Sequence, residues 1–419
     1  MLRLKSLPRV LVAHVALQIL DLHGDPADGA LLHRHPPVDE TRFRIRFPSI
    51  VRARTPQKGQ TKTFMSAADG GLSVGVDLSD LVKPIRRTLE DFRGKVLAID
   101  AFNTLYQFLA IIRQPDGTPL HDRQGRVTSH LSGLIYRTSN FVGAGIRPVF
   151  VFDGEAPRRK ARTIHARIEV KQRAEREWRE AVAVGDLQRA RTKAMQTSRL
   201  TSEMVEQSRR LLDLLGIPWM QAPAEGEAQA AFMAREGAAW GVGSQDHDAL
   251  LFGAPILVKN LAITGRRKLP RKNVWVEVSP EEISLDATLK DLGITREQLV
   301  DLGIFVGTDF NEGVRGIGPK KALAAIKKHG RAEGLLAELG VEIEGLDEVR
   351  AIFLDPRVVP VLPLAWRPAD PERVKAMLCD EFDFSPERID QALAKFEVAR
   401  KAAGQSSLDI YSDSREEKV

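Results

Sequence analysis

The sequence contains a single cysteine, Cys379, among 419 residues. One thiol cannot form an internal disulfide and cannot build a cysteine-based zinc site. A reducing interior is therefore the natural compartment, although one cysteine is also compatible with export. No uncharged apolar run reaches the roughly 18 residues that a membrane-spanning helix requires, so an integral membrane protein is not expected.

The composition is that of a folded protein, with 43% hydrophobic and 28% charged residues, which excludes global disorder and a collagen-like fibre. The length allows roughly two to three domains of about 150 residues. The net charge of +6 invites a nucleic-acid partner, but residues 1–74 carry +5 of it, from 11 basic and 6 acidic side chains. The remaining residues carry only +1, so binding has to be judged from how charge is segregated along the chain.

Residues 1–74 differ from the rest of the chain. An apolar stretch at 10–17 follows three basic residues and resembles a weak signal sequence, but His14 interrupts it and no small-x-small cleavage site follows cleanly. Pro/His/Arg-rich residues come next, and then a Gly/Ser/Ala-rich stretch at 65–73. We expect this extension to be disordered or not to belong to the native protein.

From Gly75 onward, short apolar runs end in carboxylates. Residues 95–100 and 148–153 are buried-strand patterns that end at Asp100 and Asp153, and the weaker strand 240–245 runs into Asp246 and Asp248. An amphipathic helix is predicted over 128–142. Strands that alternate with helices predict an α/β fold with a largely parallel central sheet flanked by helices. Ligands of such sheets collect at the carboxyl ends of the strands, where these aspartates fall.

The segment 157–200 is strongly basic, with 13 Lys/Arg against 5 Asp/Glu. Apolar positions are sparse between Arg158 and Glu180, and Gly185-Asp186 separates this helical pattern from a second helix at 187–194. A helix that is polar on all sides is marginal alone. An exposed helical hairpin is one interpretation. We favour a phosphate-attracting helical arch, about 157–205, over the carboxylate cluster.

Seven acidic residues stand at the ends of predicted elements, and this clustering favours a metal site. One aspartate at a strand end is usually a turn or cap residue, but that reading is improbable for the whole set. Clustered carboxylates repel one another and need a counter-cation. Oxygen ligands without histidine or cysteine suit Mg²⁺ or Mn²⁺ and argue against zinc. The set comprises Asp100, Asp153, Glu225, Glu227, Asp246, Asp248 and Asp309.

The spacing of two acidic pairs refines this prediction. Glu225 and Glu227 would lie about 200° apart on a regular helix, so we place Glu225 at a helix start and Glu227 in its first turn. Asp246 and Asp248 are placed on a strand-to-loop turn in the same way. Two Mg²⁺ ions about 3.5–4 Å apart would activate a water molecule and stabilise the leaving oxygen of a phosphodiester.

The segment 316–321, Gly-Ile-Gly-Pro-Lys-Lys, lies between two predicted helices, 296–306 and 321–328. Its glycines allow a tight turn, and its lysines lie beside a helix N-terminus that begins with proline. A plain glycine turn is the alternative. We favour a helix-hairpin-helix, about 295–330, that binds duplex DNA without reading bases. The binding residues would be Gly316, Gly318, Lys320 and Lys321.

Taken together, these motifs resemble the flap endonuclease family of the 5′-nuclease superfamily, over about four-fifths of the sequence. The segments that carry the resemblance are 75–78, 99–107, 136–138, 151–154, 224–228, 245–248, 307–309 and 316–321. The resemblance implies a PIN-like fold and a structure-specific 5′-flap endonuclease and 5′–3′ exonuclease. Such an enzyme acts in Okazaki fragment maturation and DNA repair by a two-metal-ion mechanism.

The resemblance also assigns roles. The seven carboxylates would hold two Mg²⁺ ions, which Mn²⁺ could replace, and Lys160 and Arg167 would steady the scissile phosphate. Tyr106 would stack on a base, with core packing as the alternative, and Arg113 and Arg137 would contact DNA. A monovalent cation is implied at the helix-hairpin-helix.

The sequence departs from the family in a few places. The acidic pairs have Gly226 and His247 where the family often has alanine and methionine. Family members begin at the glycine matched by Gly75, so we expect translation of the native protein to start at codon 74. Residues 1–73 would then come from an overextended gene prediction. Gly75 would be the N-terminal residue after processing.

The last residues, 401–419, are predicted to be a flexible tail after a nuclease core at 75–400. Gln405, Leu408 and Tyr411 match the family's box for binding a sliding clamp (PCNA), although Ser412 replaces its second aromatic residue. An inert tail is the alternative.

Two other functions remain open: a non-catalytic DNA-junction or clamp-associated scaffold, and a sibling 5′ nuclease with another substrate preference. We expect a monomer that binds branched DNA with a 5′ flap and no membrane. The compact size resembles archaeal members, so the expected location is the cytoplasm, or the nucleus in a eukaryote.

Overall fold

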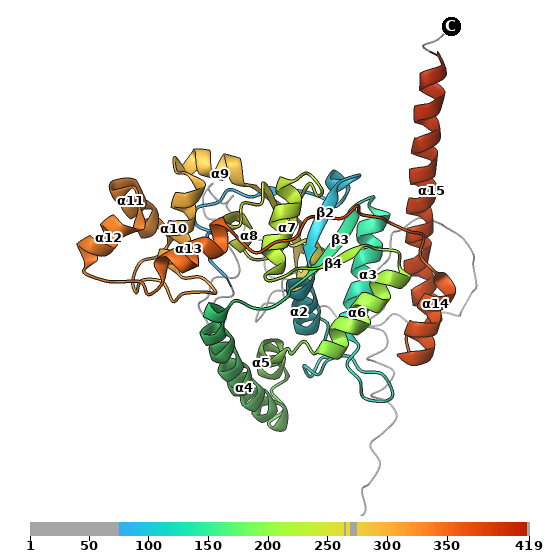
Figure 1. The fold of residues 1–419 in the computed structure, drawn as a ribbon. Coiled ribbons are helices and arrows are strands. Elements are labelled where there is room, and N and C mark those ends of the chain that lie inside the picture. The colour runs from blue at the N-terminus through green and yellow to red at the C-terminus, as the bar shows by residue number, and fades with distance from the viewer. Residues whose placement is uncertain (1–74, 264, 269–274, 417–419) are drawn as a thin grey trace, which may run out of the picture. The chain divides into compact units, whose positions relative to one another are not determined.

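A computed structural model describes residues 75–263, 265–268 and 275–416 (Figure 1). The expectations for residues 1–74 lie outside the described residues. A seven-stranded sheet has the order β1-β9-β6-β5-β2-β3-β4. In this order its strands are Ile85–Arg86, Glu281–Ser284, Ile256–Lys259, Gly241–Gly243, Val96–Asp100, Arg147–Phe152 and Trp219–Gln221.

The five strands from β6 to β4 are parallel, which confirms the predicted α/β fold with a largely parallel sheet. Strands β9 and β1 add an antiparallel edge that the sequence did not reveal. A separate antiparallel pair joins β7 (Gly265–Lys268) to β8 (Trp275–Val278).

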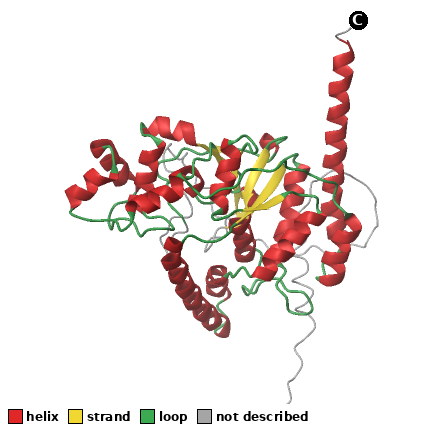
Figure 2. Cartoon of the chain, in the orientation of Figure 1, coloured by secondary structure: helices red, strands yellow, loops and turns green. Residues whose placement is uncertain are grey.

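The sheet is apolar on both faces, as a central parallel sheet covered by helices requires. Alternate residues of β2 pack on opposite sides: Leu97 and Ile99 belong to one apolar core and Ala98 to the other. Strand β3 repeats the pattern, with Phe150 in the first core and Val149 in the second. Figure 2 shows the strands enclosed between helices.

Each face has its own helices, and their apolar side chains complete the two cores. The core that contains Ile99 includes residues of α2 (Ala101–Ile111), α3 (Ser129–Gly143), α6 (Ser202–Leu214), α14 (Pro371–Lys375), the π-helix Ala376–Glu381 and α15 (Pro386–Glu416). The core that contains Ala98 includes residues of α7 (Gly226–Arg235), α8 (Asp248–Leu251), α9 (Leu285–Leu292), α10 (Arg296–Val306), α11 (Pro319–His329), α12 (Ala332–Leu339) and α13 (Leu346–Leu354). Two short 3₁₀ turns lie at Glu90–Phe92 and Leu261–Ile263.

The basic segment forms a helical hairpin, drawn in dark green in Figure 1. A 3₁₀ turn at Arg158–Lys160 leads into α4 (Ala161–Ala183), and α5 (Leu187–Ala194) returns to a 3₁₀ turn at Met195–Thr197. Alanines are the buried residues of both helices, so the pair packs closely through small side chains while its long polar side chains face solvent. Gly185 separates the helices in the left-handed region, with φ of 74°. We keep the name arch for residues 157–205.

The helix-hairpin-helix has the expected elements, since α10 ends before Asp309 and α11 begins at Pro319 with Gly318 as its N-cap. Helix α15 continues to Glu416, so its backbone is helical through most of the segment predicted as a tail. The side chains of the clamp-like motif, residues 405–412, lie outside those that the structure describes. Within the described ranges, no helix is long and apolar enough to cross a membrane.

Candidate active site

Three adjacent strands deliver four of the predicted carboxylates to one edge of the sheet. Strand β2 ends at Asp100, β3 ends one residue before Asp153, and β5 leads into the turn that carries Asp246 and Asp248. The order β5-β2-β3 places these ends side by side. Asp100 also caps α2, because its carboxylate accepts a hydrogen bond of 2.9 Å from the amide of Asn103. The cap and the site therefore use the same carboxylate.

Helix α7 contributes the next two carboxylates as the spacing predicted. Glu225 is its N-cap residue, and Glu227 lies in its first turn, where it accepts a 2.6 Å hydrogen bond from the hydroxyl of Ser244. Between them, the amide of Gly226 donates to Asp153 Oδ1 at 2.7 Å. A Cβ at residue 226 would stand 2.6 Å from that oxygen, so glycine suits this close approach.

Asp309 and the first described residues complete the edge. Asp309 follows α10 in the loop 307–313, and its Oδ1 accepts a 3.2 Å hydrogen bond from the amide of Gly75. The next amide, of Val76, donates to Asp248 Oδ1 at 2.7 Å. Gly75 has a left-handed φ of 71°, and a Cβ there would lie 3.1 Å from Asp248 Oδ1. The glycine start of the core therefore packs directly on two of the predicted metal ligands.

Burial makes these carboxylates hard to ionise together. Burial is the largest cause raising the pKa of Asp100 and Glu227 well above their usual values, and neighbouring carboxylates add to it. The same causes raise the pKa of Asp246 to about 6 and that of Asp248 to about 8. Burial also raises the pKa of Asp153 and Glu225, against the opposing effect of nearby Lys160. The site therefore lacks positive charge for its full set of carboxylates.

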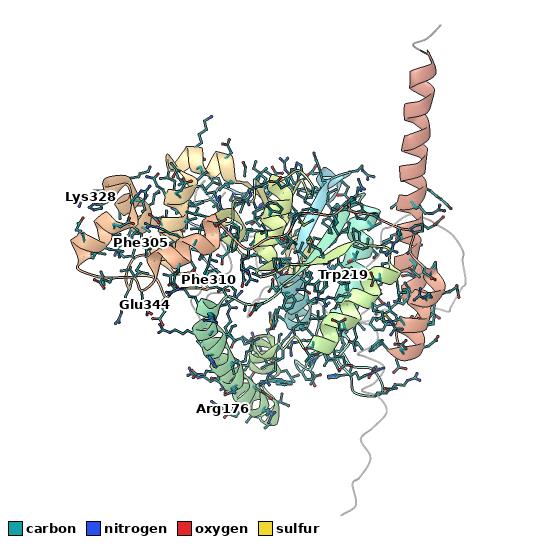
Figure 3. All side chains as sticks on the ribbon, viewed as in Figure 1. Arg176, Trp219, Phe305, Phe310, Lys328 and Glu344 are labelled. Carbon is teal, nitrogen blue, oxygen red and sulfur yellow. The ribbon has the colours of Figure 1, made fainter. Side chains whose placement is uncertain are left out.

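Two side chains from the start of the arch supply part of that charge. Lys160 pairs with Glu225 and lies 3.5 Å from Asp309 Oδ2, while Arg167 pairs with Asp309. Coulombic attraction by these carboxylates raises the pKa of Lys160 although burial opposes it. The hydroxyl of Thr163 donates to the backbone carbonyl of Asp309 at 2.8 Å. Phe310, labelled in Figure 3, lies under Lys160, with 5.9 Å between the ammonium and the ring centroid.

The donor set fits divalent cations. Within the described ranges, no three acidic, histidine or cysteine side chains are already arranged in metal-ligand geometry, and two of the acidic groups, Glu225 and Asp309, pair with Lys160 and Arg167. The donors are nevertheless all carboxylate oxygens, and a hard cation such as Mg²⁺ or Mn²⁺ would favour the ionised form of those whose pKa values are raised. The residues present therefore fit the predicted metal ions.

Three predicted DNA-contacting residues lie in different surroundings. Tyr106 is 36% exposed, and the ammonium of Lys171 lies 4.7 Å from its ring centroid, so the ring faces the arch. Arg137 is half-buried on α3, and burial lowers its pKa. The guanidinium of Arg113 donates to the carbonyls of Leu109 and Gly117, both at 2.8 Å, and to the hydroxyl of Ser198 at 3.0 Å.

The glycine turn before α11 is open on its outer side. A Cβ added at Gly316 or Gly318 would meet nothing within 4 Å, and Gly316 has a left-handed φ of 84°. Lys321 donates to the carbonyl of Gly316 at 3.0 Å, while Lys320 pairs with Asp80 at 3.2 Å. The backbone here is accessible to a phosphate chain at the start of a helix.

Several residues of the site were not predicted. Asn103 donates from Nδ2 to Asp246 Oδ2 at 2.8 Å, and its place in the first turn after a strand-end aspartate could have marked it. His247 was noted only as a departure from the family, although it separates two candidate ligands. Lys259 carries no local signal, because its place beside the site depends on the pairing of β6 with β5.

The chain is similar in sequence and in fold to known proteins. Two family models match, the XPG N-terminal domain at residues 75–174 and the XPG I-region at 216–309. Flap endonuclease 1 of Aeropyrum pernix is 52% identical over 348 residues, 81% of this chain and 99% of the relative. The solved flap endonuclease-1 from Methanococcus jannaschii is 40% identical with a TM-score of 0.62, over 78% of this chain and 98% of that one. The catalytic core of Rad2 in complex with DNA substrate, 24% identical with a TM-score of 0.54, shares the fold over 76% of this chain and 96% of its own.

Proposed function

The chain belongs to the flap endonuclease 1 family and is a structure-specific 5′-flap nuclease, and we propose that it cuts with two Mg²⁺ ions held by its seven clustered carboxylates. Its family acts in DNA replication and repair, its reaction is phosphodiester hydrolysis, and its substrate is DNA. The observation that supports the metal proposal is the collection of buried carboxylates with raised pKa values at one sheet edge.

The residues of the site have separate tasks in this proposal. The ligands are Asp100, Asp153, Glu225, Glu227, Asp246, Asp248 and Asp309, acting directly or through water. When bound there, the ions supply a hydroxide nucleophile at neutral pH and stabilise the leaving oxygen. Lys160 and Arg167 exchange their present carboxylate partners for the scissile phosphate and neutralise the charge that develops on it.

The DNA-binding residues orient the substrate. Gly316, Gly318, Lys320 and Lys321 hold the duplex backbone through amides and charge, independently of sequence, beside a bound monovalent cation. Tyr106 stacks on a base where the strand unpairs, because its ring faces the arch and is partly exposed. Arg137 contacts the DNA from α3. Arg113 contacts the DNA as well, beside the loop before α3 that it joins to the end of the arch.

A substrate panel tests the proposal on the full chain. A double-flap DNA should be cut in Mg²⁺ or Mn²⁺ and left intact in EDTA, and Asp246→Ala should abolish cutting while the Kd for the DNA stays within a few-fold. Bubble, hairpin and RNA substrates serve as comparisons for a sibling nuclease. Undiminished turnover by Asp246→Ala, or cutting in EDTA, would overturn the two-metal proposal. Binding without cutting by the unmodified chain would favour a scaffold.

The C-terminal helix offers a second binding function. We propose that Gln405, Leu408 and Tyr411 bind a sliding clamp, on a backbone that is helical to Glu416. A peptide of residues 400–416 should bind the clamp of the same organism by calorimetry, and Tyr411→Ala should weaken it. No heat of binding from the native peptide would remove this proposal. A monomeric state and a cytoplasmic location complete the proposal and are open to light scattering and cell fractionation.

A further inference from the structure

A buried histidine lies between two of the proposed ligands and contacts neither of them through its ring. His247 is 3% exposed and follows Asp246 in the turn after β5. Its Nε2 lies 3.0 Å from the ammonium nitrogen of Lys259, on β6. Its Nδ1 lies 3.3 Å from the backbone carbonyl of Val76. The ring therefore connects the sheet with the first residues of the core.

The charge of Lys259 determines which nitrogen of the ring carries the proton. A protonated ammonium can only donate, so Nε2 of His247 must accept its hydrogen bond. The proton of the neutral ring then sits on Nδ1, where it can be donated to the carbonyl of Val76 at 3.3 Å, while the backbone amide of Leu78 also lies 3.4 Å from Nδ1. Nε2 therefore faces Lys259, and Nδ1 faces the backbone of residues 76–78.

The backbone of residues 75–76 also donates hydrogen bonds to two of the proposed ligands. The amide of Val76 donates to Asp248 Oδ1 at 2.7 Å, and the amide of Gly75 donates to Asp309 Oδ1 at 3.2 Å. The carbonyl and the amide of Val76 therefore link the histidine to a ligand through one residue. In this series of contacts, the oxygens of Asp248 and Asp309 accept hydrogen bonds from backbone amides only.

We propose that Lys259 and His247 are positioning residues that hold the Gly75–Val76 backbone against Asp248 and Asp309 and so set the direction in which those two carboxylates face the metal ions. Groups that orient metal ligands from behind commonly change metal affinity or activity by about 10–100-fold when they are removed. This inference rests on the proposed function, since it assigns what orients the proposed ligands.

A simpler role for Lys259 makes the opposite prediction. As a half-buried positive charge beside acidic residues, it repels divalent cations, so its removal by itself would tighten Mg²⁺ binding. Loss of the positioning contacts would weaken Mg²⁺ binding instead. The sign of the change in Lys259→Met therefore separates the two roles.

The variants are made in the full chain. His247→Phe removes both ring hydrogen bonds at similar volume, Lys259→Met removes the ammonium, and Lys259→Arg keeps a charged donor. We expect the first two to bind Mg²⁺ about 10-fold or more weakly by calorimetry without DNA, and to need correspondingly more Mg²⁺ for half-maximal cutting. Hydrogen exchange at residues 75–78 should be faster in both, and Lys259→Arg should restore most of each property.

A control variant separates positioning from general loss of stability. Trp366→Phe removes the 2.9 Å hydrogen bond from the indole to the carbonyl of Pro148, near the start of β3, whereas Asp153 follows the other end of that strand. It should lower the melting temperature slightly while its Mg²⁺ requirement and the exchange at 75–78 stay as in the native chain. If His247→Phe does not fold, His247→Gln decides, because it keeps an acceptor for Lys259 and loses the contact with Val76.

Each outcome decides one question. Native Mg²⁺ affinity and native exchange in His247→Phe (or in His247→Gln, where that variant is used) and Lys259→Met would overturn the inference, as would tighter Mg²⁺ binding in Lys259→Met. The proposed function would stand in both cases, provided that Asp246→Ala has lost cutting. Absence of Mg²⁺ binding by the native chain would instead refute the proposed function itself.

Discussion

The carboxylate edge of the sheet and the arch carry opposite charges in opposite surroundings. The carboxylates are buried or half-buried, as the 4% exposure of Asp248 illustrates, and burial raises the pKa of that residue to about 8. The arch charges face solvent, and pairs such as Arg179–Glu175 at 2.6 Å are surface ion pairs worth roughly 0–1 kcal/mol. A charged side chain on the arch costs little free energy because water solvates it, whereas an ionised carboxylate at the sheet edge requires a nearby cation.

The two regions meet at Lys160 and Arg167, whose side chains are 14% and 23% exposed and reach the carboxylates. Arg176, labelled in Figure 3, lies farther along the same helix, away from the sheet. The comparison teaches that position along one basic helix separates catalytic candidates from general phosphate attraction.

The first change removes one buried charge. Asp248→Asn keeps an oxygen for the amide of Val76 but loses the negative charge of a proposed metal ligand. Loss of several kcal/mol of charge stabilisation corresponds to roughly 10³-fold or more in rate, so cutting should nearly vanish. In EDTA at pH 8 the same variant should melt at a higher temperature than the native chain, because a like charge has been removed. Equal or lower melting temperature would contradict the repulsion described above.

The second change compares two arch arginines. Arg167→Ala removes a cation that reaches Asp309, and the rate of cutting should fall about 10²–10³-fold, as for other groups that stabilise developing charge. Arg162→Ala is the matched control, since Arg162 is 80% exposed and pairs with Glu312 at the surface. It should reduce DNA affinity only a few-fold, in a salt-dependent way. Equal single-turnover losses in both variants would remove the distinction between the two positions.

The third test follows stability with pH in EDTA. The pKa of Asp246 rises from 3.8 to about 6, and that of Asp248 from 3.8 to about 8, on folding. The folded protein therefore binds more protons than the unfolded chain between these values, and the free energy of unfolding should fall as pH rises from about 4 to about 8. The melting temperature of Asp248→Asn should fall less steeply, and saturating Mg²⁺ should remove most of the decline. If the free energy of unfolding of the native chain in EDTA did not change with pH, the proposed repulsion between ionised carboxylates would be contradicted.

The smallest expected effect concerns Tyr106, which lies between the two regions. Tyr106→Ala removes the stacking surface, and base–aromatic stacking of about 1–3 kcal/mol predicts a loss of roughly 5- to 150-fold in kcat/KM. Tyr106→Phe keeps the ring and should be close to native in cutting. If both variants lost stability equally and neither lost cutting, the ring would be a packing residue, as the alternative interpretation holds.

Local patterns carried much of the fold prediction. The helices expected at 187–194 and 296–306 have those bounds in the structure, the run at 95–100 contains β2, and the run at 148–153 is offset by one residue from β3. These predictions agree with the structure because strong apolar runs are separated by glycines in the sequence. The antiparallel edge was missed because β1 has two exposed residues, Ile85 and Arg86, whose strand state exists only through pairing with β9.

The site shows the same division. All seven carboxylates were named before the structure, because each lies at or near the end of an element that the sequence pattern predicts. Arg113 was assigned to DNA by resemblance, but its bonds to Gly117 and Ser198 depend on how the loop meets the end of the arch. Lys259 was not named at all, since no spacing along the chain relates it to Val76.

By itself, the sequence determined which residue types stand at the ends of which strands and helices, because those choices follow from short-range periodicity, glycine and proline. Tertiary structure alone decided that Asp309, Gly75 and the start of the arch converge on the same edge of the sheet. It also decided how deeply each carboxylate is buried, and burial is the largest cause of the raised pKa values. Desolvation and Coulomb interactions depend on distances in space, which no distance along the chain supplies.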